Sequence, residues 1–265
     1  MEEPGYHKIR MIYDAGGVAC VSAPLDQNGV RPDSLENAQV LHISPAHHFP
    51  TGLVTSLDRR LALLKWAGED KWIIEDDYDS EFRFDARPKP TLQSLDRWGR
   101  VIYMNTFSKS LAPSIRISYM VLPGPLMDQF QRRLGFYSCT VPSFEQVTLA
   151  RFLSRGYFEK HINRMRKFYR LRRDRVVALL ENCPFRDRLT ILEQDAGLHF
   201  LLKVDTQQSD EDLMARCAAA GIRIRSLSSY YHGPVPEEDL HCLGVNYSGL
   251  DEKALDTLGK ILDQI

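Results

Sequence analysis

The 265-residue sequence has few cysteines and almost no net charge. Its five cysteines form no CxxC pair or other metal-ligand spacing, and their odd number favours reduced core thiols over disulfides. The single adjacent histidine pair, His47-His48, has no third ligand at a suitable offset, which disfavours a metal centre. The formal net charge of -1 gives this segment no basic field for binding nucleic acid.

Long hydrophobic runs are also missing. No stretch of about 18 apolar residues is present for a membrane span, and the first residues, Met1-Glu2-Glu3-Pro4, lack the charged and apolar regions of a signal peptide. The composition, with 43% hydrophobic and 26% charged residues, is typical of a globular protein that buries a sizeable core. We therefore expect a cytoplasmic protein.

Short apolar runs alternate with helical patterns in the first half of the chain. The runs at residues 39–44, 71–75, 101–106 and 117–122 predict strands, and the leucine spacing over residues 56–66 predicts a helix. Strands that alternate with helices imply a mainly parallel, helix-covered sheet. The predicted fold class is therefore α/β.

The second half begins with helical patterns and then returns to strands. A long helix over residues 157–180 is dense in arginine and lysine, but an apolar stripe that includes Phe168, Leu171, Val176 and Leu180 favours a solvated charged face over a nucleic-acid site. The other expected helices are residues 126–137, 143–154, 210–220 and 251–265, and the expected strands are residues 189–192, 197–204, 222–227 and 241–247.

Two strand ends carry the residues with chemical potential. Lys109 lies in Thr106-Phe107-Ser108-Lys109, seven residues before Arg116, and Asp76, Asp77 and Tyr78 close an earlier strand. An aldehyde cofactor needs an amine for a Schiff base, a carboxylate for its ring nitrogen, a phenol near its ring oxygen, and hydroxyls and a guanidinium for its phosphate. Each residue alone is ordinary in a loop or a helix cap, but together at strand ends they predict a pyridoxal phosphate site.

These motifs resemble a known family. The similar segments are residues 106–109 with Arg116, residues 75–83 (EDDYDSEFR), residues 44–52 (SPAHHFPTG), residues 3–7 (EPGYH) and residues 196–200 (AGLHF). They resemble the fold type I, pyridoxal-phosphate-dependent aminotransferases, and more closely the aminotransferase-like domain of the MocR/GabR transcription regulators. In those regulators this domain binds the cofactor and an effector, and a separate winged-helix domain of the GntR type binds DNA.

The resemblance implies roles at the phosphate end of the cofactor. Lys109 corresponds to the lysine that forms the Schiff base. Thr106, Ser108 and Arg116 correspond to residues that contact the phosphate.

It also implies roles around the cofactor ring. Asp76 would pair with the pyridine nitrogen, Tyr78 would donate a hydrogen bond to the ring oxygen, and Tyr6 would stack on the ring face. The two-residue spacing from Asp76 to Tyr78 is one shorter than is usual in aminotransferases, which leaves Asp77 as an alternative partner of the nitrogen.

Two departures from the family pattern bear on the site. Phe49 stands where aminotransferases normally have an asparagine that contacts the ring oxygen, so His48 or Tyr78 would have to replace that contact. The last predicted strand lacks the arginine that grips the substrate carboxylate, since Cys242 or Gly244 occupies its position, depending on the alignment. The loss of a bidentate arginine disfavours transamination of an α-amino acid.

Arg223 and Arg225 alternate along the preceding predicted strand and therefore face one way together. They are candidates to replace the missing arginine. A solvated strand face is the interpretation that we favour from the sequence alone.

The resemblance also implies an organisation. Residues 1–155 would form part of the cofactor-binding large domain with the start of the interdomain helices, and residues 156–265 would form the long connecting helix and a smaller α+β domain. The winged helix, its linker and a glycine-containing phosphate turn would lie outside this chain. Relatives build each cofactor pocket at a two-fold interface, which implies a homodimer.

The functional expectation is a regulator domain. We expect the effector-binding and oligomerisation domain of a bacterial MocR/GabR-like regulator, which senses an amino compound or pyridoxal 5'-phosphate through a Lys109 aldimine. DNA would be bound only by the domain outside this chain. The alternatives are a class I/II aminotransferase, in which Lys109 also moves a proton, and a dimerisation module without a cofactor.

Overall fold

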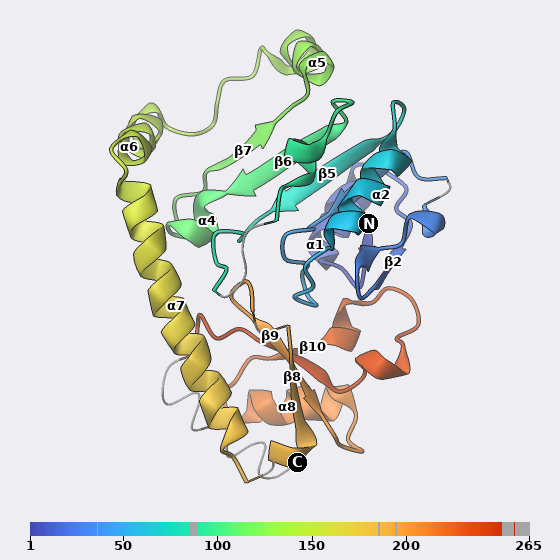
Figure 1. Ribbon diagram of the computed structural model, residues 1–265, viewed down its shortest axis with the longest axis vertical. Helices are drawn as coiled ribbons and strands as arrows, with labels where there is room; N and C mark the ends of the chain where they lie inside the picture. The colour runs from blue at the N-terminus through green and yellow to red at the C-terminus, as the bar shows by residue number, and fades with distance from the viewer. Residues whose placement is uncertain (36, 85–88, 185, 194, 251–256, 258–265) are drawn as a thin grey trace.

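The computed structural model describes the chain except residues 36, 85–88, 185, 194, 251–256 and 258–265. Within those limits it contains two four-stranded sheets and one small three-stranded sheet. Figure 1 shows the two larger sheets in different halves of the molecule, with the long helix α7 (Tyr157–Glu181) running along one side of both. None of the helices in the described residues has the length and apolar character that a membrane span requires.

The first large sheet has the strand order β4-β5-β6-β7. Its strands are β4 (Val40–Ile43), β5 (Trp72–Asp77), β6 (Val101–Thr106) and β7 (Ser118–Val121). The first three are parallel and β7 is antiparallel. Because parallel strands end at the same edge of a sheet, the register places Asp76 beside Met104 and Asp77 beside Asn105, just before the lysine-bearing segment.

Helix α2 (Leu57–Ala67) packs against this sheet. The helix begins after Ser56, whose side chain accepts a hydrogen bond from the backbone N–H of Arg59 at 3.2 Å and so satisfies one of the free donors of the first turn. Its apolar residues enter the first core, which also contains strand residues. The shared buried residues include Leu63, Leu64 and Ala67 from the helix and Leu41, Ile43, Ile73 and Val101 from the strands.

Short elements complete this half of the molecule. The small sheet consists of β1 (Glu2–Glu3), β2 (Ala23–Asp26) and β3 (Gly29–Val30), and the further helices are α1 (His7–Ala15), α3 (Leu92–Leu95), α4 (Phe107–Ser110), α5 (Gly124–Leu134) and α6 (Ser143–Ser154). Helix α4 begins directly where β6 ends, which fixes Lys109 at the carboxyl edge of the sheet.

The second large sheet is antiparallel, with the order β10-β11-β9-β8. Its strands are β8 (Leu189–Leu192), β9 (Phe200–Val204), β10 (Arg225–Ser226) and β11 (Cys242–Val245). Helix α8 (Asp210–Ala219) and the end of α7 pack on it around a second buried core. The short 3-10 helices are Pro32–Ser34, Arg186–Arg188, Leu227–Tyr230 and Glu237–Asp239.

The predicted helices at residues 56–66, 143–154, 157–180 and 210–220 are confirmed to within one residue at each end. The predicted strand at residues 222–227 is longer than the observed one, since only Arg225 and Ser226 pair with β11. The predicted helix at residues 251–265 lies outside the described residues, apart from position 257.

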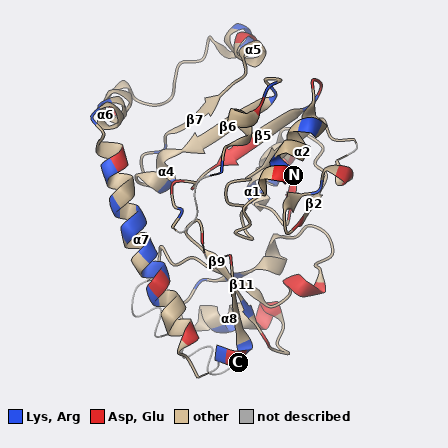
Figure 2. Ribbon diagram, in the orientation of Figure 1, with Lys and Arg blue, Asp and Glu red and all other residues tan. Residues whose placement is uncertain are grey.

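The apolar stripe predicted for the long helix is only half right. Val176 and Leu180 are fully buried in the second core, but Phe168 and Leu171 are 51% and 62% exposed. The reason is the helix face: Ile162 and Arg173 share the buried side of α7 with Val176 and Leu180, and Tyr169 packs against the same core, whereas Leu171 lies on the opposite side of the helix. Figure 2 shows lysine and arginine along much of its length, as expected for a solvated face.

Candidate functional site

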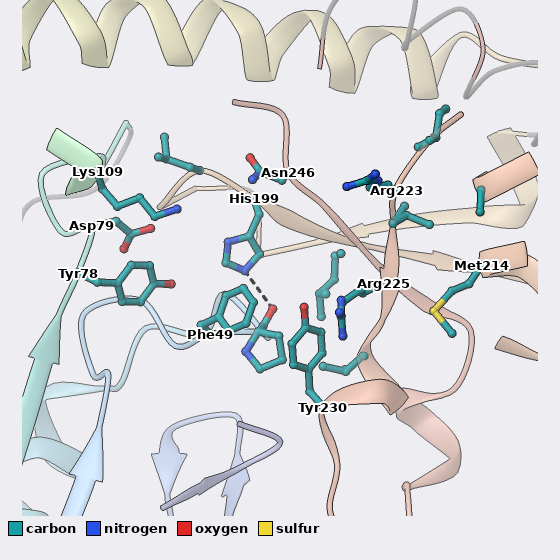
Figure 3. A pocket seen from close by; sticks show the side chains of 18 of the residues that line it. Phe49, Tyr78, Asp79, Lys109, His199, Met214, Arg223, Arg225, Tyr230 and Asn246 are labelled. Carbon is teal, nitrogen blue, oxygen red and sulfur yellow. Dashed lines mark hydrogen bonds between the residues drawn. The ribbon is translucent and has the colours of Figure 1, made fainter. Parts of the chain in front are cut away.

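Two cavities meet at Lys109. The first, which we call the small cavity, has a volume of about 300 Å³ and lies at the carboxyl edge of the first sheet. The second, the large cavity, has a volume of about 670 Å³ and extends to residues of the second sheet (Figure 3). Lys109, Tyr78 and Phe49 line both. A ligand in either cavity would therefore lie next to Lys109.

Four of the predicted cofactor residues line the small cavity. They are Tyr6, Asp76, Tyr78 and Lys109, which come from the start of α1, the end of β5, the residue after it and α4. They are spread over more than 100 residues of sequence and are brought together because β5 and β6 are adjacent parallel strands. The chemical roles that we assigned to them remain predictions.

The two consecutive aspartates of β5 have different surroundings. Asp76 faces the small cavity, whereas Asp77 is buried and accepts hydrogen bonds from the hydroxyls of Tyr103 at 2.7 Å and Ser80 at 2.8 Å. Burial raises the pKa of the Asp77 carboxyl. The alternation of side chains along a strand thus favours Asp76 over Asp77 as the carboxylate available to a ligand.

A histidine that the sequence analysis did not single out lies beside Asp76. His42, on the neighbouring strand β4, has its Nε2 3.7 Å from Asp76 Oδ2, and its Nδ1 lies 2.7 Å from the Tyr13 hydroxyl. With the tyrosine donating to Nδ1, the ring carries its hydrogen on Nε2, directed toward the carboxylate. The sequence could have indicated this contact, because His42 lies in a predicted strand next to the predicted strand that carries Asp76.

Tyr78 is held by a buried histidine and its carboxylate. The Tyr78 hydroxyl lies 3.0 Å from His47 Nδ1, and the same nitrogen lies 2.9 Å from Asp79 Oδ2. Because a carboxylate is the stronger acceptor, Nδ1 donates to Asp79 and the tyrosine keeps its own proton. Burial, together with Asp79 and Asp76, raises the pKa of Tyr78 well above its usual value, so the phenol remains a hydrogen-bond donor.

His48 is placed differently from our expectation. It does not line either cavity, and its Nδ1 lies 2.7 Å from Thr51 Oγ1 inside the loop. Burial, followed by the nearby His47 and His199, lowers the pKa of His48 to about 3, so the ring is neutral. Adjacent residues of this loop point in different directions, and His47 is the one directed toward Tyr78.

Phe49 forms the wall between the two cavities. Its ring contacts Tyr6, His199 and Tyr230 with centroid distances of 5.6, 5.4 and 5.1 Å, each in an edge-to-face arrangement. The phenylalanine that replaces the family's asparagine is therefore the centre of an aromatic cluster. It offers a ligand an apolar surface and no polar contact.

The three predicted phosphate contacts surround α4 without lining either cavity. Thr106 caps the helix, since its Oγ1 accepts from the backbone N–H of Ser108 at 3.2 Å and lies 3.0 Å from the Ser108 hydroxyl. Arg116 is exposed and has a left-handed backbone with φ of 48°. A left-handed arginine is a strained conformation of the kind found at ligand sites.

The large cavity contains residues from both sheets. His199 is buried, and its Nε2 donates to the carbonyl of Pro50 at 3.0 Å, so Nδ1 is an acceptor. Burial, with His47 nearby, lowers the pKa of His199 to about 4, which keeps the ring neutral. Arg223 and Arg225 also line this cavity, and both are exposed. The two interpretations of these arginines, as a solvated face and as a replacement for the missing arginine, both stay predictions.

The two candidate positions of the missing family arginine have different surroundings. Gly244 and Asn246 of the last strand segment line the large cavity. Cys242 lies on the same face but is 1% exposed, packed with Leu201 and Leu227. Burial raises the pKa of the Cys242 thiol to about 11. Gly244 is thus the position that faces a ligand in this cavity, and it offers no side chain.

The residues of the small cavity fit pyridoxal phosphate. They supply an amine, a carboxylate on the adjacent strand, a protonated phenol and an aromatic face, with two hydroxyls and a guanidinium on the segment around α4. In the described residues Lys109 has no hydrogen-bond partner or ion pair. Its amine is therefore available to a carbonyl ligand, which is the chemistry that this cofactor requires.

Comparison with known families identifies the fold. The family described as aminotransferase class I and II matches residues 1–261. Among solved structures, the kynurenine aminotransferase of Pyrococcus horikoshii, in complex with PMP and kynurenine, superimposes with a TM-score of 0.84 at 26% identity and covers 99% of this chain and 68% of that chain. The predicted α/β, fold type I architecture is confirmed.

Several similar curated proteins are named as regulators. The uncharacterized HTH-type transcriptional regulator YdeL of Bacillus subtilis is 40% identical over 256 residues, which are 95% of this chain and 55% of that protein. The probable rhizopine catabolism regulatory protein MocR of Rhizobium meliloti is 36% identical over 260 residues, or 96% and 52%. The pyridoxine biosynthesis regulator PdxR of Corynebacterium glutamicum is 32% identical over 235 residues, or 88% and 51%. The chain spans about half the length of these relatives.

Proposed function

The chain belongs to the aminotransferase class I and II family, and we propose that within this family it is the cofactor-binding and effector-binding domain of a MocR-type transcription regulator. Pyridoxal 5'-phosphate is its cofactor. The observation that carries the proposal is that Lys109 and Asp76 line one cavity in a chain whose similar curated proteins are named as transcription regulators.

The cofactor supplies an aldehyde that reacts reversibly with amines. In this proposal Lys109 would provide the amine that holds it, and Asp76, with His42 beside it, would hold the ring nitrogen in its protonated form. Tyr78 would donate a hydrogen bond to the ring oxygen while keeping its proton, and its hydroxyl lies beside His47, which is bound to Asp79. Phe49 and Tyr6 exclude water from the ring faces.

Sensing requires only the binding half of aminotransferase chemistry. An amine-bearing effector, or the cofactor itself, changes the contacts at Lys109 between the two sheets. A ligand that binds one arrangement of the sheets more tightly than another shifts the population toward it. A missing carboxylate arginine at Gly244 is compatible with this role, whereas efficient transamination of an α-amino acid depends on such a group.

The remaining parts of the function follow from the same proposal. The protein acts in the cytoplasm as a homodimer, and a winged-helix domain in a longer protein binds DNA, as the HTH-type relatives suggest by name. The DNA immediately upstream of this coding segment provides a direct test. An open reading frame for a winged helix there is expected, and its absence would count against the regulator.

Lys109→Ala tests the cofactor directly. The wild-type protein is loaded with pyridoxal phosphate and separated from free cofactor. It should then keep an absorbance band at a longer wavelength than the absorbance of the cofactor-free protein, and Lys109→Ala should lose this band. Lys65→Ala is the matched control, because Lys65 is an exposed lysine of α2 away from both cavities. Identical spectra for wild type and Lys109→Ala would contradict cofactor binding at Lys109 and would favour a dimerisation module without a cofactor.

A class I/II aminotransferase is the alternative, since a solved structure that superimposes on this chain is an aminotransferase. The two functions differ in whether an amino acid loses its amino group on the protein. Single-turnover addition of amino acids, with assay of the keto acid, separates them. A keto acid formed in an amount equal to the protein supports the enzyme, and spectral change without keto acid supports the regulator.

A further inference from the structure

The arginine that is missing from β11 has a substitute on the paired strand. In the antiparallel register of β10 and β11, the Cα partner of Gly244 is Arg225. Both residues line the large cavity. A Cβ at position 244 would meet only the backbone oxygen of Arg225, at an ordinary 3.6 Å, so the space beside this glycine is open to the neighbouring side chain.

The two arginines bring uncompensated positive charge to this cavity. Arg223 and Arg225 are exposed, and within the described residues neither guanidinium group has an ion pair or a hydrogen bond. The single acidic residue among those that line the cavity, Asp79, is bound by His47. Two guanidinium groups on one wall without a carboxylate partner form a site for an anion.

Figure 3 shows the arginines and Lys109 on opposite sides of the large cavity, with His199 and Phe49 between them. The volume of about 670 Å³ is sufficient for a ligand larger than a simple amino acid. In an α-amino acid the amine and the carboxylate are attached to the same carbon. A longer molecule with separated ends suits binding groups that face the cavity from opposite sides.

We propose that Arg225, with Arg223 beside it, binds the carboxylate of an effector whose primary amine is separated from that carboxylate by several carbon atoms. This inference rests on the proposed function, because the amine end is assigned to the cofactor at Lys109. The middle of the ligand packs on Phe49 and beside the neutral His199. Tyr230 and Asn246, which line the same cavity, are further polar contacts for its anionic end.

The experiment uses the cofactor-loaded protein and a series of defined probes. The amino acids are glycine, β-alanine and 6-aminohexanoate, with hexylamine as the probe without a carboxylate and hexanoate as the probe without an amine. We expect 6-aminohexanoate to bind more tightly than glycine or hexylamine. Arg225→Gln should weaken binding of 6-aminohexanoate and hexanoate by about 10- to 100-fold and leave hexylamine unchanged, as expected for loss of a charged hydrogen bond.

Two further variants test the position of the charge. Arg97→Gln is the matched control, since Arg97 is exposed and outside both cavities, and it should leave every affinity unchanged. In the double variant Arg225→Gln with Gly244→Arg, the guanidinium returns on the paired strand, and binding of hexanoate should recover. That rescue distinguishes a binding role from a structural role of Arg225.

The outcomes separate the inference from the proposed function. Hexanoate binding, followed by calorimetry, needs neither Lys109 nor the cofactor, so it reports on Arg225 even where the cofactor spectrum is absent. Equal binding of hexanoate and 6-aminohexanoate by wild type and Arg225→Gln overturns the inference. Loss of the spectral difference between wild type and Lys109→Ala overturns the proposed function and leaves the hexanoate result to stand by itself.

Discussion

Asp76 and Asp77 are consecutive residues of β5, and their carboxylates lie on opposite faces of the sheet. Asp76 lines the small cavity near His42, and Asp77 is enclosed by Tyr103 and Ser80. The pair therefore provides an internal control for cofactor binding. Asp76→Asn removes a carboxylate that lines the small cavity, whereas Asp77→Asn removes a carboxylate on the opposite face of the sheet.

Asp76→Asn should lower the affinity for pyridoxal phosphate by about 10- to 100-fold, because a charged hydrogen bond to the ring nitrogen is lost. Asp77→Asn should leave that affinity unchanged. The measurement is titration of the protein with the cofactor, followed by the absorbance of the bound form. Weaker binding in Asp77→Asn with normal binding in Asp76→Asn would reverse the assignment of the two residues.

Gly197 holds His47 in place by having no side chain. Its φ is +71°, and a Cβ there would lie 1.8 Å from His47 Cε1. Gly197→Ala should therefore lower the free energy of unfolding by at least about 3 kcal/mol, from overpacking and from the left-handed backbone together. It should also weaken cofactor binding, since His47 orients Tyr78.

Gly221→Ala is the control for backbone conformation. Gly221 has φ of +83°, but a Cβ at this position would have no atom within 4 Å, so only the backbone term of about 1 kcal/mol applies. Urea unfolding of the two variants measures the difference. Equal losses in the two proteins would mean that the contact with His47 adds nothing.

Much of the fold was accessible from the sequence because local signals agree with the tertiary structure. The apolar runs at residues 39–44, 71–75 and 101–106 correspond to β4, β5 and β6, and parallel strands necessarily place their carboxyl ends at one edge. The convergence of Asp76, Tyr78 and Lys109 on one cavity follows from that topology.

The features that sequence reasoning missed depend on non-local geometry. His47 and His48 are adjacent in an irregular loop, where no periodicity says which ring faces Tyr78. The pairing of Arg225 with Gly244 depends on the register of β10 and β11, and strand register is set by contacts between distant segments. Phe168 was assigned to a buried stripe from its apolar character, but the next residue, Tyr169, is the one on the helix face that packs against the second core.

Acid should destabilise the protein through His199. Its folded-state pKa of about 4 lies below the ordinary value of 6.5 because the ring is buried, so between these values the unfolded state binds more protons and stability falls as the pH falls. From pH 7 to pH 5 this histidine should cost about 2 kcal/mol. His199→Gln, which retains a donor for the Pro50 carbonyl, should show a smaller loss over the same range.

The difference between the two proteins isolates this residue from other buried groups. Glu81, whose pKa burial raises to about 7, acts with the opposite sign, since a raised acid favours the folded state at low pH. That contribution is common to wild type and variant and cancels. Denaturant unfolding at pH 7, 6 and 5 gives the comparison, and parallel pH curves for the two proteins would contradict the assignment to His199.

Arg116 combines a strained backbone with a predicted phosphate contact, which allows stability and binding to be separated. Asparagine tolerates a left-handed φ better than arginine does, so Arg116→Asn should raise the free energy of unfolding by roughly 0.5–1 kcal/mol and weaken cofactor binding by about 10-fold or more. Arg116→Lys keeps the charge and the backbone strain, and should lower affinity less without the gain in stability. If Arg116→Asn binds the cofactor as tightly as the wild type does, Arg116 does not contact the phosphate. If the variant is more stable but binds the cofactor more weakly, the backbone strain at position 116 is retained for binding.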